Sequence, residues 1–234
     1  MTHNPCMPHR LKYERDHGTF FGREHELEWI HRTFFDCRII SLYGLGGIGK
    51  TRITVKYIYA YEHDYNTIFW ANVDTNETLI SSFVGMAQQM VDCDSQFSSD
   101  HTELSGPGFT STAHQGNLID HQGSIFTSAN MSAHVIDRVM LWLSDDGFGK
   151  WLLVLDNADD LVNVNLPQFF PTASSGRILI TSRNPNTHHF GIGHETQLLT
   201  EDAAVQLLLQ KSRKDIGGGS YALHTLQTSF IDVM

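Results

Sequence analysis

The sequence predicts an α/β fold with a mostly parallel sheet of five strands between two layers of helices. Short apolar runs that suit buried strands alternate along the chain with segments whose apolar residues recur at helical spacing. The predicted strands are apolar at consecutive positions, which indicates burial on both faces of a parallel sheet. The 234 residues are 41% hydrophobic, enough for one domain with a buried core.

The first part of the chain predicts three helices and two strands. Apolar residues at helical spacing predict helices over Phe20–Phe34 and Gly49–Tyr61. Short apolar runs predict strands over Arg38–Gly44 and Thr67–Val73. A third helix is expected over Thr75–Met90, with its threonine as the cap.

The composition changes over Asp92–Met131. This stretch is rich in Ser, Thr, Gly, His and Asp and has no apolar periodicity, and no lysine or arginine occurs between Lys56 and Arg138. We expect a long disordered insertion here. A functional lid is the alternative, although no pattern in the segment indicates chemistry.

The second part of the chain predicts a helix over Ala133–Asp145 and an apolar strand over Trp151–Asp160 that ends in acids. Another strand is expected over Gly176–Arg183, and a short extended segment over Thr196–Thr200. The last predicted helix, Thr200–Ser212, opens with a threonine cap and two acids.

The composition excludes several classes of function. A formal net charge of −10 argues against non-specific binding to nucleic acid or to anionic lipid. No apolar run is long enough to span a membrane, and the polar leader 1–18 lacks the apolar core of a secretion signal. Cys6, Cys37 and Cys93 are far apart, which favours a reducing, cytoplasmic setting. The 14 histidines show no metal-ligand spacing and are expected on the surface.

The segment Leu42–Ile53, "LYGLGGIGKTRI", lies between a predicted strand and a predicted helix. The pattern G-x-x-x-x-G-K-[ST] is filled by Gly44, Gly49, Lys50 and Thr51, with further glycines at Gly46 and Gly47. Glycines let the backbone N–H groups approach phosphate oxygens, and the next helix points its positive end there. Lys50 can reach the β- and γ-phosphates, and the Thr51 hydroxyl can bind Mg²⁺. The segment therefore predicts a nucleotide phosphate site, whereas a structural glycine turn leaves Lys50 unexplained.

Two later strands end in charged residues that suit such a site. Asp156 ends an apolar strand, where a carboxylate for Mg²⁺ is needed. Asn157 follows, where many ATPases place an acid that activates water. Asp159 and Asp160 either act on that water or cap the next turn. Arg183, at the end of another strand, either senses the γ-phosphate or is an ordinary surface arginine.

Together these segments resemble the NB-ARC family of signal-transduction ATPases, the nucleotide switches of NLR-type immune and cell-death receptors. The resemblance covers roughly Thr19–Ser212 and rests on "FFGREHEL" (Phe20–Leu27), "GLGGIGKT" (Gly44–Thr51), "WLLVLDNADD" (Trp151–Asp160), "ILITSR" (Ile178–Arg183) and "LLTEDAAVQLLL" (Leu198–Leu209). These look like the hhGRExEL box, Walker A, Walker B in the DNADD form of fungal relatives with tetratricopeptide repeats, the sensor-1 strand and the first helix of the next subdomain.

The resemblance implies a three-layer P-loop NTPase fold and a role for each matching residue. Phe21, Gly22 and Arg23 would lie beside adenine, and Gly44, Gly46, Gly47, Gly49, Lys50 and Thr51 would hold the phosphates of ADP or ATP. Thr51 and Asp156 would bind Mg²⁺, Arg183 would contact the γ-phosphate, and Asp156, Asp159 and Arg183 are the catalytic candidates. The nucleotide-binding domain would span 19–200, and 201–234 would hold a partial helical subdomain and a divergent tail.

Departures from the family pattern keep other interpretations open. The family continues with a GLPL-type motif and a winged helix, for which the sequence after Ser212 shows no match. We expect a truncated receptor, an alternative product or a mis-assembled gene model, at most a slow ATPase, with self-association or a full-length relative as partner. The alternatives are an active AAA+-like ATPase or small-molecule kinase, and a non-functional fragment or decoy.

Overall fold

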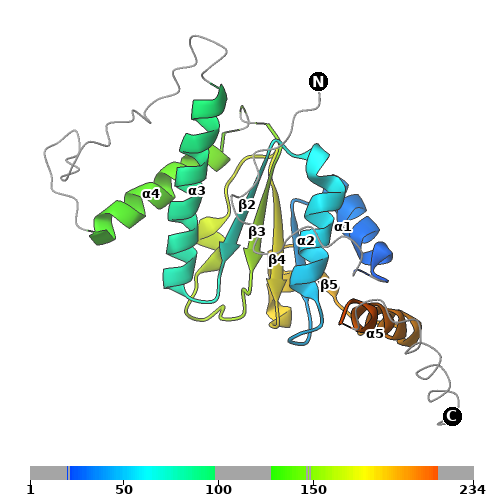
Figure 1. Cartoon of the computed structure of the whole chain (residues 1–234). Helices are drawn as coiled ribbons and strands as arrows, with labels where there is room; N and C mark the ends of the chain where they lie inside the picture. Colours follow the sequence, from blue (N-terminus) through cyan, green and yellow to red (C-terminus); the bar gives the residue numbers. More distant parts are fainter. Residues whose placement is uncertain (1–19, 21, 98–127, 146, 148, 216–234) are drawn as a thin grey trace, which may run out of the picture.

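The computed structural model describes residues 20, 22–97, 128–145, 147 and 149–215, in which helices and strands alternate (Figure 1). The strands are β1 (Ile39–Tyr43), β2 (Thr67–Asn72), β3 (Trp151–Asp156), β4 (Arg177–Ser182) and β5 (Ile192–Glu195). The α-helices are α1 (Glu24–Asp36), α2 (Lys50–Tyr61), α3 (Asn76–Phe97), α4 (Ser128–Leu143) and α5 (Glu201–Asp215). Short 3₁₀ helices are η1 (Glu62–Asp64), η3 (Leu166–Phe169) and η4 (Pro185–Phe190).

The five strands form one sheet in the order β2-β3-β4-β1-β5, and all its pairings are parallel. The predicted α/β class with a five-stranded sheet is therefore confirmed. Because β4 lies between β1 and β3, the carboxyl ends of these three strands meet at one edge. The register places Tyr43 beside Ser182 and Asp156 beside Asn72 at that edge, where open parallel sheets bind ligands.

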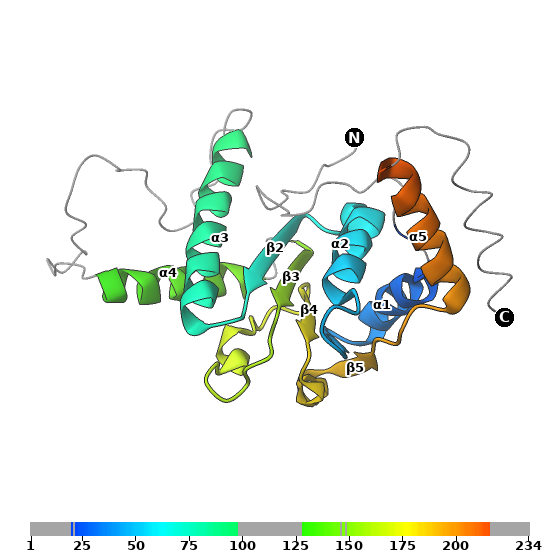
Figure 2. The same ribbon diagram turned by 60° about the horizontal axis from the view of Figure 1, so that its bottom comes forward.

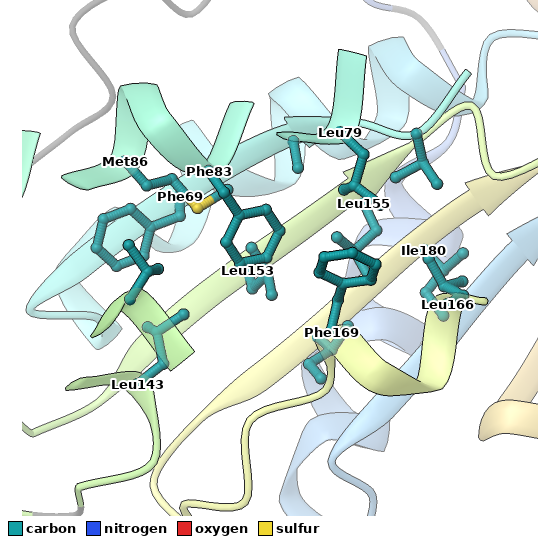
Figure 3. Packing of buried hydrophobic residues seen from close by; sticks show 14 of the residues in the cluster. Phe69, Leu79, Phe83, Met86, Leu143, Leu153, Leu155, Leu166, Phe169 and Ile180 are labelled. Carbon is teal, nitrogen blue, oxygen red and sulfur yellow. The ribbon is translucent and has the colours of Figure 1, made fainter. Parts of the chain in front are cut away.

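Helices cover both faces of the sheet, with α1 and α2 on one side and α3 and α4 on the other (Figure 1). Successive residues of β3 point to opposite faces: Leu152 and Val154 pack with α1 and α2, whereas Leu153 and Leu155 pack with α3. Figure 3 shows Phe83 of α3 among the apolar side chains over β3. All six positions of β3 are buried, which explains its continuous apolar sequence.

Local signals placed most helices correctly. Leu27, Ile30 and Phe34 form the buried stripe of α1, as their spacing predicts. The Thr75 hydroxyl accepts a hydrogen bond from the Thr78 N–H at 3.2 Å, and thereby caps α3 as expected. A predicted threonine cap also starts α5, where the Ala203 N–H donates to the Thr200 hydroxyl at 3.4 Å.

The fifth strand is not where the sequence predicts it. The extended segment was expected over Thr196–Thr200, but β5 covers Ile192–Glu195. Its residues pair through their main chain with β1, and their side chains are exposed or half-buried, so no apolar run marks the strand. Glycine at position 191 lets the chain approach β1 closely just before β5, because a Cβ there would overlap the Ile39 carbonyl.

The predicted disordered stretch 92–131 extends too far at both ends. Helix α3 continues to Phe97, and α4 begins at Ser128, so the ends of the predicted disordered stretch 92–131 are helical. Its interior lies outside the described residues. Although α3 is 22 residues long, neither it nor another helix in the described ranges is long and apolar enough to cross a membrane.

The close contact between Gly176 and Trp151 leads to a prediction about the free energy of unfolding. A Cβ at position 176 would overlap the buried indole, so Gly176→Ala should lower the free energy of unfolding by roughly 1–3 kcal/mol. Gly85 in α3 is the control, because its Cβ would meet open space. Gly85→Ala should raise stability by about 0.5–1 kcal/mol. Urea titration of both variants measures this, and equal effects would contradict the packing argument.

Candidate functional site

A glycine-rich loop joins β1 to α2 at the carboxyl edge of the sheet. Gly47 and Gly49 have φ angles of +77° and +102°, which residues with a side chain rarely adopt. A Cβ at either position would meet nothing within 4 Å, so conformation and not space requires glycine there. Gly49 is the N-cap of α2, and no side chain caps this helix. The N–H groups of its first turn therefore remain suited to an anion.

Lys50 is a buried cation, with only 8% of its surface exposed. Its ammonium group donates to the carbonyls of Gly44 and Leu45, both at 2.9 Å. Among the described residues, no carboxylate forms an ion pair with it. Burial lowers the pKa of Lys50, against the effect of the Asp159 charge. An anionic ligand would offset this desolvation, because it would supply the missing counter-charge.

Asp156 joins the loop to the sheet. Its carboxylate accepts a hydrogen bond from the Thr51 hydroxyl at 3.0 Å and another from the Thr181 hydroxyl. Burial raises the pKa of the Asp156 carboxyl, while these two hydroxyl bonds act in the opposite direction.

The hydroxyl and the carboxylate fit a nucleotide-bound Mg²⁺, which prefers oxygen ligands and usually takes one or two carboxylates together with phosphate oxygens. In the described part of the chain, no cluster of three or more His, Cys, Asp or Glu could hold a metal ion. Thr51 and Asp156 could hold Mg²⁺ jointly with the phosphates of a nucleotide.

Asp159 and Arg183 form an ion pair across the ends of β3 and β4. The Arg183 Nε donates to Asp159 Oδ2 at 2.5 Å, and the Arg183 main-chain N–H donates to Oδ1 at 2.5 Å. The Ser182 hydroxyl donates to the same Oδ1 at 3.1 Å. The two charged candidates from separate segments are thus direct partners.

A cavity of about 500 Å³ lies between the loop and the strand ends. Its lining includes seven of the predicted site residues, namely Gly46, Gly47, Gly49, Lys50, Thr51, Asp159 and Arg183. It also includes Arg52, Asn72, Asp74, Asn157 and Ser182, which the sequence analysis did not propose as ligands. Asn72 and Asp74 could have been found, because polar residues at the carboxyl end of a parallel strand face such clefts.

The other predicted residues in the described part of the chain, Asp156 among them, do not line this cavity. Gly44 directly follows β1, and its carbonyl accepts a hydrogen bond from Lys50. Gly22 lies so close to α5 that a Cβ there would be 2.9 Å from Ala203 Cβ. Phe21 lies outside the described residues. Arg23 is 8% exposed and is held by Glu26 on its own helix, at 2.6 Å.

The Arg23 guanidinium also connects two distant segments. It donates to the Ile48 carbonyl in the glycine-rich loop at 3.4 Å and to the Gln197 carbonyl before α5 at 2.7 Å. Figure 2 shows α5 on the side of the sheet that α1 and α2 cover. Arg23 therefore links the phosphate loop to the start of α5, a role that its sequence position does not reveal.

A parallel sheet, a glycine-rich loop that opens into a helix, and a hydroxyl–carboxylate pair at the loop define a nucleotide-binding protein of the P-loop class. A sequence model of the NB-ARC domain matches residues 23–215. The chain therefore belongs to the NB-ARC family, and the predicted membership is confirmed.

Individual relatives agree with this assignment. A nucleotide-binding leucine-rich repeat (NLR)-like protein of Hyaloscypha variabilis is 24% identical over 230 residues, which cover 86% of this chain and 20% of that protein. An uncharacterized WD repeat-containing protein of Nostoc is 49% identical over 43 residues, 18% of this chain and 3% of that protein. The chain thus spans about a fifth or less of these relatives.

A solved structure shows the same fold. A Walker-type ATPase of Pyrococcus abyssi superposes with a TM-score of 0.54 at 12% identity, covering 90% of this chain and 63% of that chain. At this identity the likeness supports the fold alone.

The bridging position of Arg23 predicts a stability effect. Arg23→Ala removes charge-assisted hydrogen bonds from a buried guanidinium to two main-chain carbonyls and should lower the free energy of unfolding by about 2 kcal/mol. Arg32 on the same helix is the control, because its ion pair with Glu28 is exposed on both sides. Arg32→Ala should change stability by less than about 0.5 kcal/mol in thermal unfolding. Similar losses in both variants would show that Arg23 is not a link.

Proposed function

We propose that the cavity binds ADP or ATP with Mg²⁺ and that the chain acts as the nucleotide-dependent switch of an NLR-like signalling ATPase. The observation that supports this most directly is the buried Lys50, whose ammonium has two carbonyls as its partners within the described ranges and no carboxylate. It lies at the uncapped start of α2, where two sources of positive potential meet. A polyphosphate is the ligand that this arrangement would stabilise most.

The adenine and sugar are proposed to lie near Gly22 and Arg23. In support, Arg23 contacts the Ile48 carbonyl of the phosphate loop, and Gly22 packs against Ala203 of α5. In this proposal the nucleotide-binding domain spans 19–200 and α5 opens a helical subdomain. Bound nucleotide would then touch both parts, which is what a switch needs.

Similarity to an NLR-like protein supports a signalling role of the immune or cell-death type, inside the cytoplasm. Self-association or binding to a longer relative would transmit the nucleotide state. The net charge of −10 supports a protein partner over nucleic acid.

Hydrolysis is proposed to be slow. Asn157 follows the Mg²⁺-binding candidate Asp156, and its side-chain amide, which donates to the Asn72 side chain at 3.4 Å, cannot take a proton from water. Turnover of roughly 1 per second or faster would favour the AAA+-like ATPase alternative instead.

The first test is nucleotide binding by the wild-type chain and by Lys50→Ala. Isothermal titration with Mg-ADP and Mg-ATP should show saturable binding that the variant lowers by at least about tenfold, because a charge-assisted contact is lost. Lys56 in the same helix is exposed and lies outside the cavity, so Lys56→Ala should bind like the parent. Unchanged binding by Lys50→Ala would refute the phosphate site.

The second test concerns Mg²⁺. Removal of Mg²⁺ with EDTA should weaken ATP binding by the wild-type chain, because the phosphates then lack their counter-ion. Thr51→Ala should lose this dependence, whereas Thr51→Ser, which keeps the hydroxyl, should retain it. If Thr51→Ala responds to Mg²⁺ like the parent, Thr51 is not a metal ligand.

A further inference from the structure

The pair formed by Asp159 and Arg183 occupies the wall of the nucleotide cavity. Arg183 is 65% exposed, yet it stays on Asp159 through both its Nε and its main-chain N–H. The carboxylate is less exposed, at 22%, and also accepts the Ser182 hydroxyl. The acid is therefore the fixed member of the pair, and the guanidinium is the member that can move.

These contacts argue against Asp159 as the base that activates water. Burial alone would raise the pKa of its carboxyl, but the hydrogen bonds from Arg183 and Ser182 outweigh burial and hold the pKa below its usual range. A carboxylate with three donors and a lowered pKa is a poor proton acceptor. Its carboxylate instead holds the Arg183 side chain in place and compensates its charge.

Both side chains lie close to the place that a terminal phosphate would take. Asp159 and Arg183 line the cavity together with Lys50. The Arg183 Cδ would be 3.3 Å from a Cβ on Gly46, so the arginine side chain lies against the phosphate loop at this glycine. Burial is the main cause that lowers the pKa of Lys50, and the nearby charges of Asp159 and Arg183 act on this pKa in opposite directions.

We propose that Asp159 holds Arg183 when no γ-phosphate is present and thereby biases the site toward ADP. This inference rests on the proposed nucleotide function and concerns its regulation. ATP has to take the guanidinium away from Asp159 and place its γ-phosphate near the negative carboxylate. ADP does neither, because Lys50 and the N–H groups of the loop would bind its β-phosphate without displacing Arg183.

The test is the ratio of the affinities for ATP and ADP. Asp159→Asn keeps the size of the side chain but removes its charge, so Arg183 is free for the γ-phosphate. The variant and the parent are titrated, in the presence of Mg²⁺, with ADP and with the β,γ-imido analogue of ATP. The ratio of the two affinities should shift by about fivefold toward the ATP analogue, a factor that corresponds to the free energy of an exposed ion pair. Affinity for ADP should stay near the parent value.

The neighbouring acid is the matched control. Asp160 bonds the Val162 and Asn163 N–H groups and does not line the cavity. Asp160→Asn removes the same charge one residue away and should leave the ratio unchanged. Asp159→Ser replaces the first variant if that variant does not fold, as judged by thermal unfolding.

The outcomes separate this inference from the proposed function. A wild-type chain that binds neither nucleotide overturns both. Binding by all chains with an unchanged ratio overturns only the role of Asp159. A shift toward ADP in Asp159→Asn also overturns it, because Asp159 would then orient Arg183 toward the phosphate. An equal shift of the affinity ratio in Asp160→Asn would show that net charge causes the effect. It would likewise overturn the proposed role of the pair.

Discussion

The buried carboxylate of Asp156 is the interaction on which the candidate site depends. It ends β3, and its two hydroxyl partners belong to the first turn of α2 and to β4. One side chain thus fixes the start of the helix after the phosphate loop to two neighbouring strands. A buried carboxylate is stable only when such partners compensate its desolvation. The parallel register, which brings the strand ends to one edge, makes this possible.

Around this anchor, the charges of Lys50 and Arg183 are compensated in different ways. Arg183 pairs with Asp159, whereas among the described residues the ammonium of Lys50 has carbonyl oxygens as its partners and no side chain caps the helix that starts there. The cost of holding a cation in this way is lowest when an anion is bound. This supports the proposal that the site binds a nucleotide and that the pair of Asp159 and Arg183 distinguishes ADP from ATP.

Contacts near β5 connect the site to α5. Arg23 reaches both the phosphate loop and the Gln197 carbonyl, and Gly22 leaves just enough room for Ala203. Thr196 continues the pairing of β5 with β1, since its N–H donates to the Tyr43 carbonyl at 2.7 Å. These contacts join the phosphate loop to the segment before α5.

The sequence by itself determined the class of fold, the central strands and the phosphate loop. Strands buried on both faces need continuous apolar runs, and a loop with positive φ angles needs glycines, so both leave local patterns. Seven predicted residues do line one cavity. Only the tertiary structure decided the edge strand β5, the helical ends around the insertion, the partners of Arg23 and the pairing of Asp159 with Arg183. These features depend on which segments lie side by side, through main-chain bonds and single contacts between distant residues that leave no periodic signal in the chain.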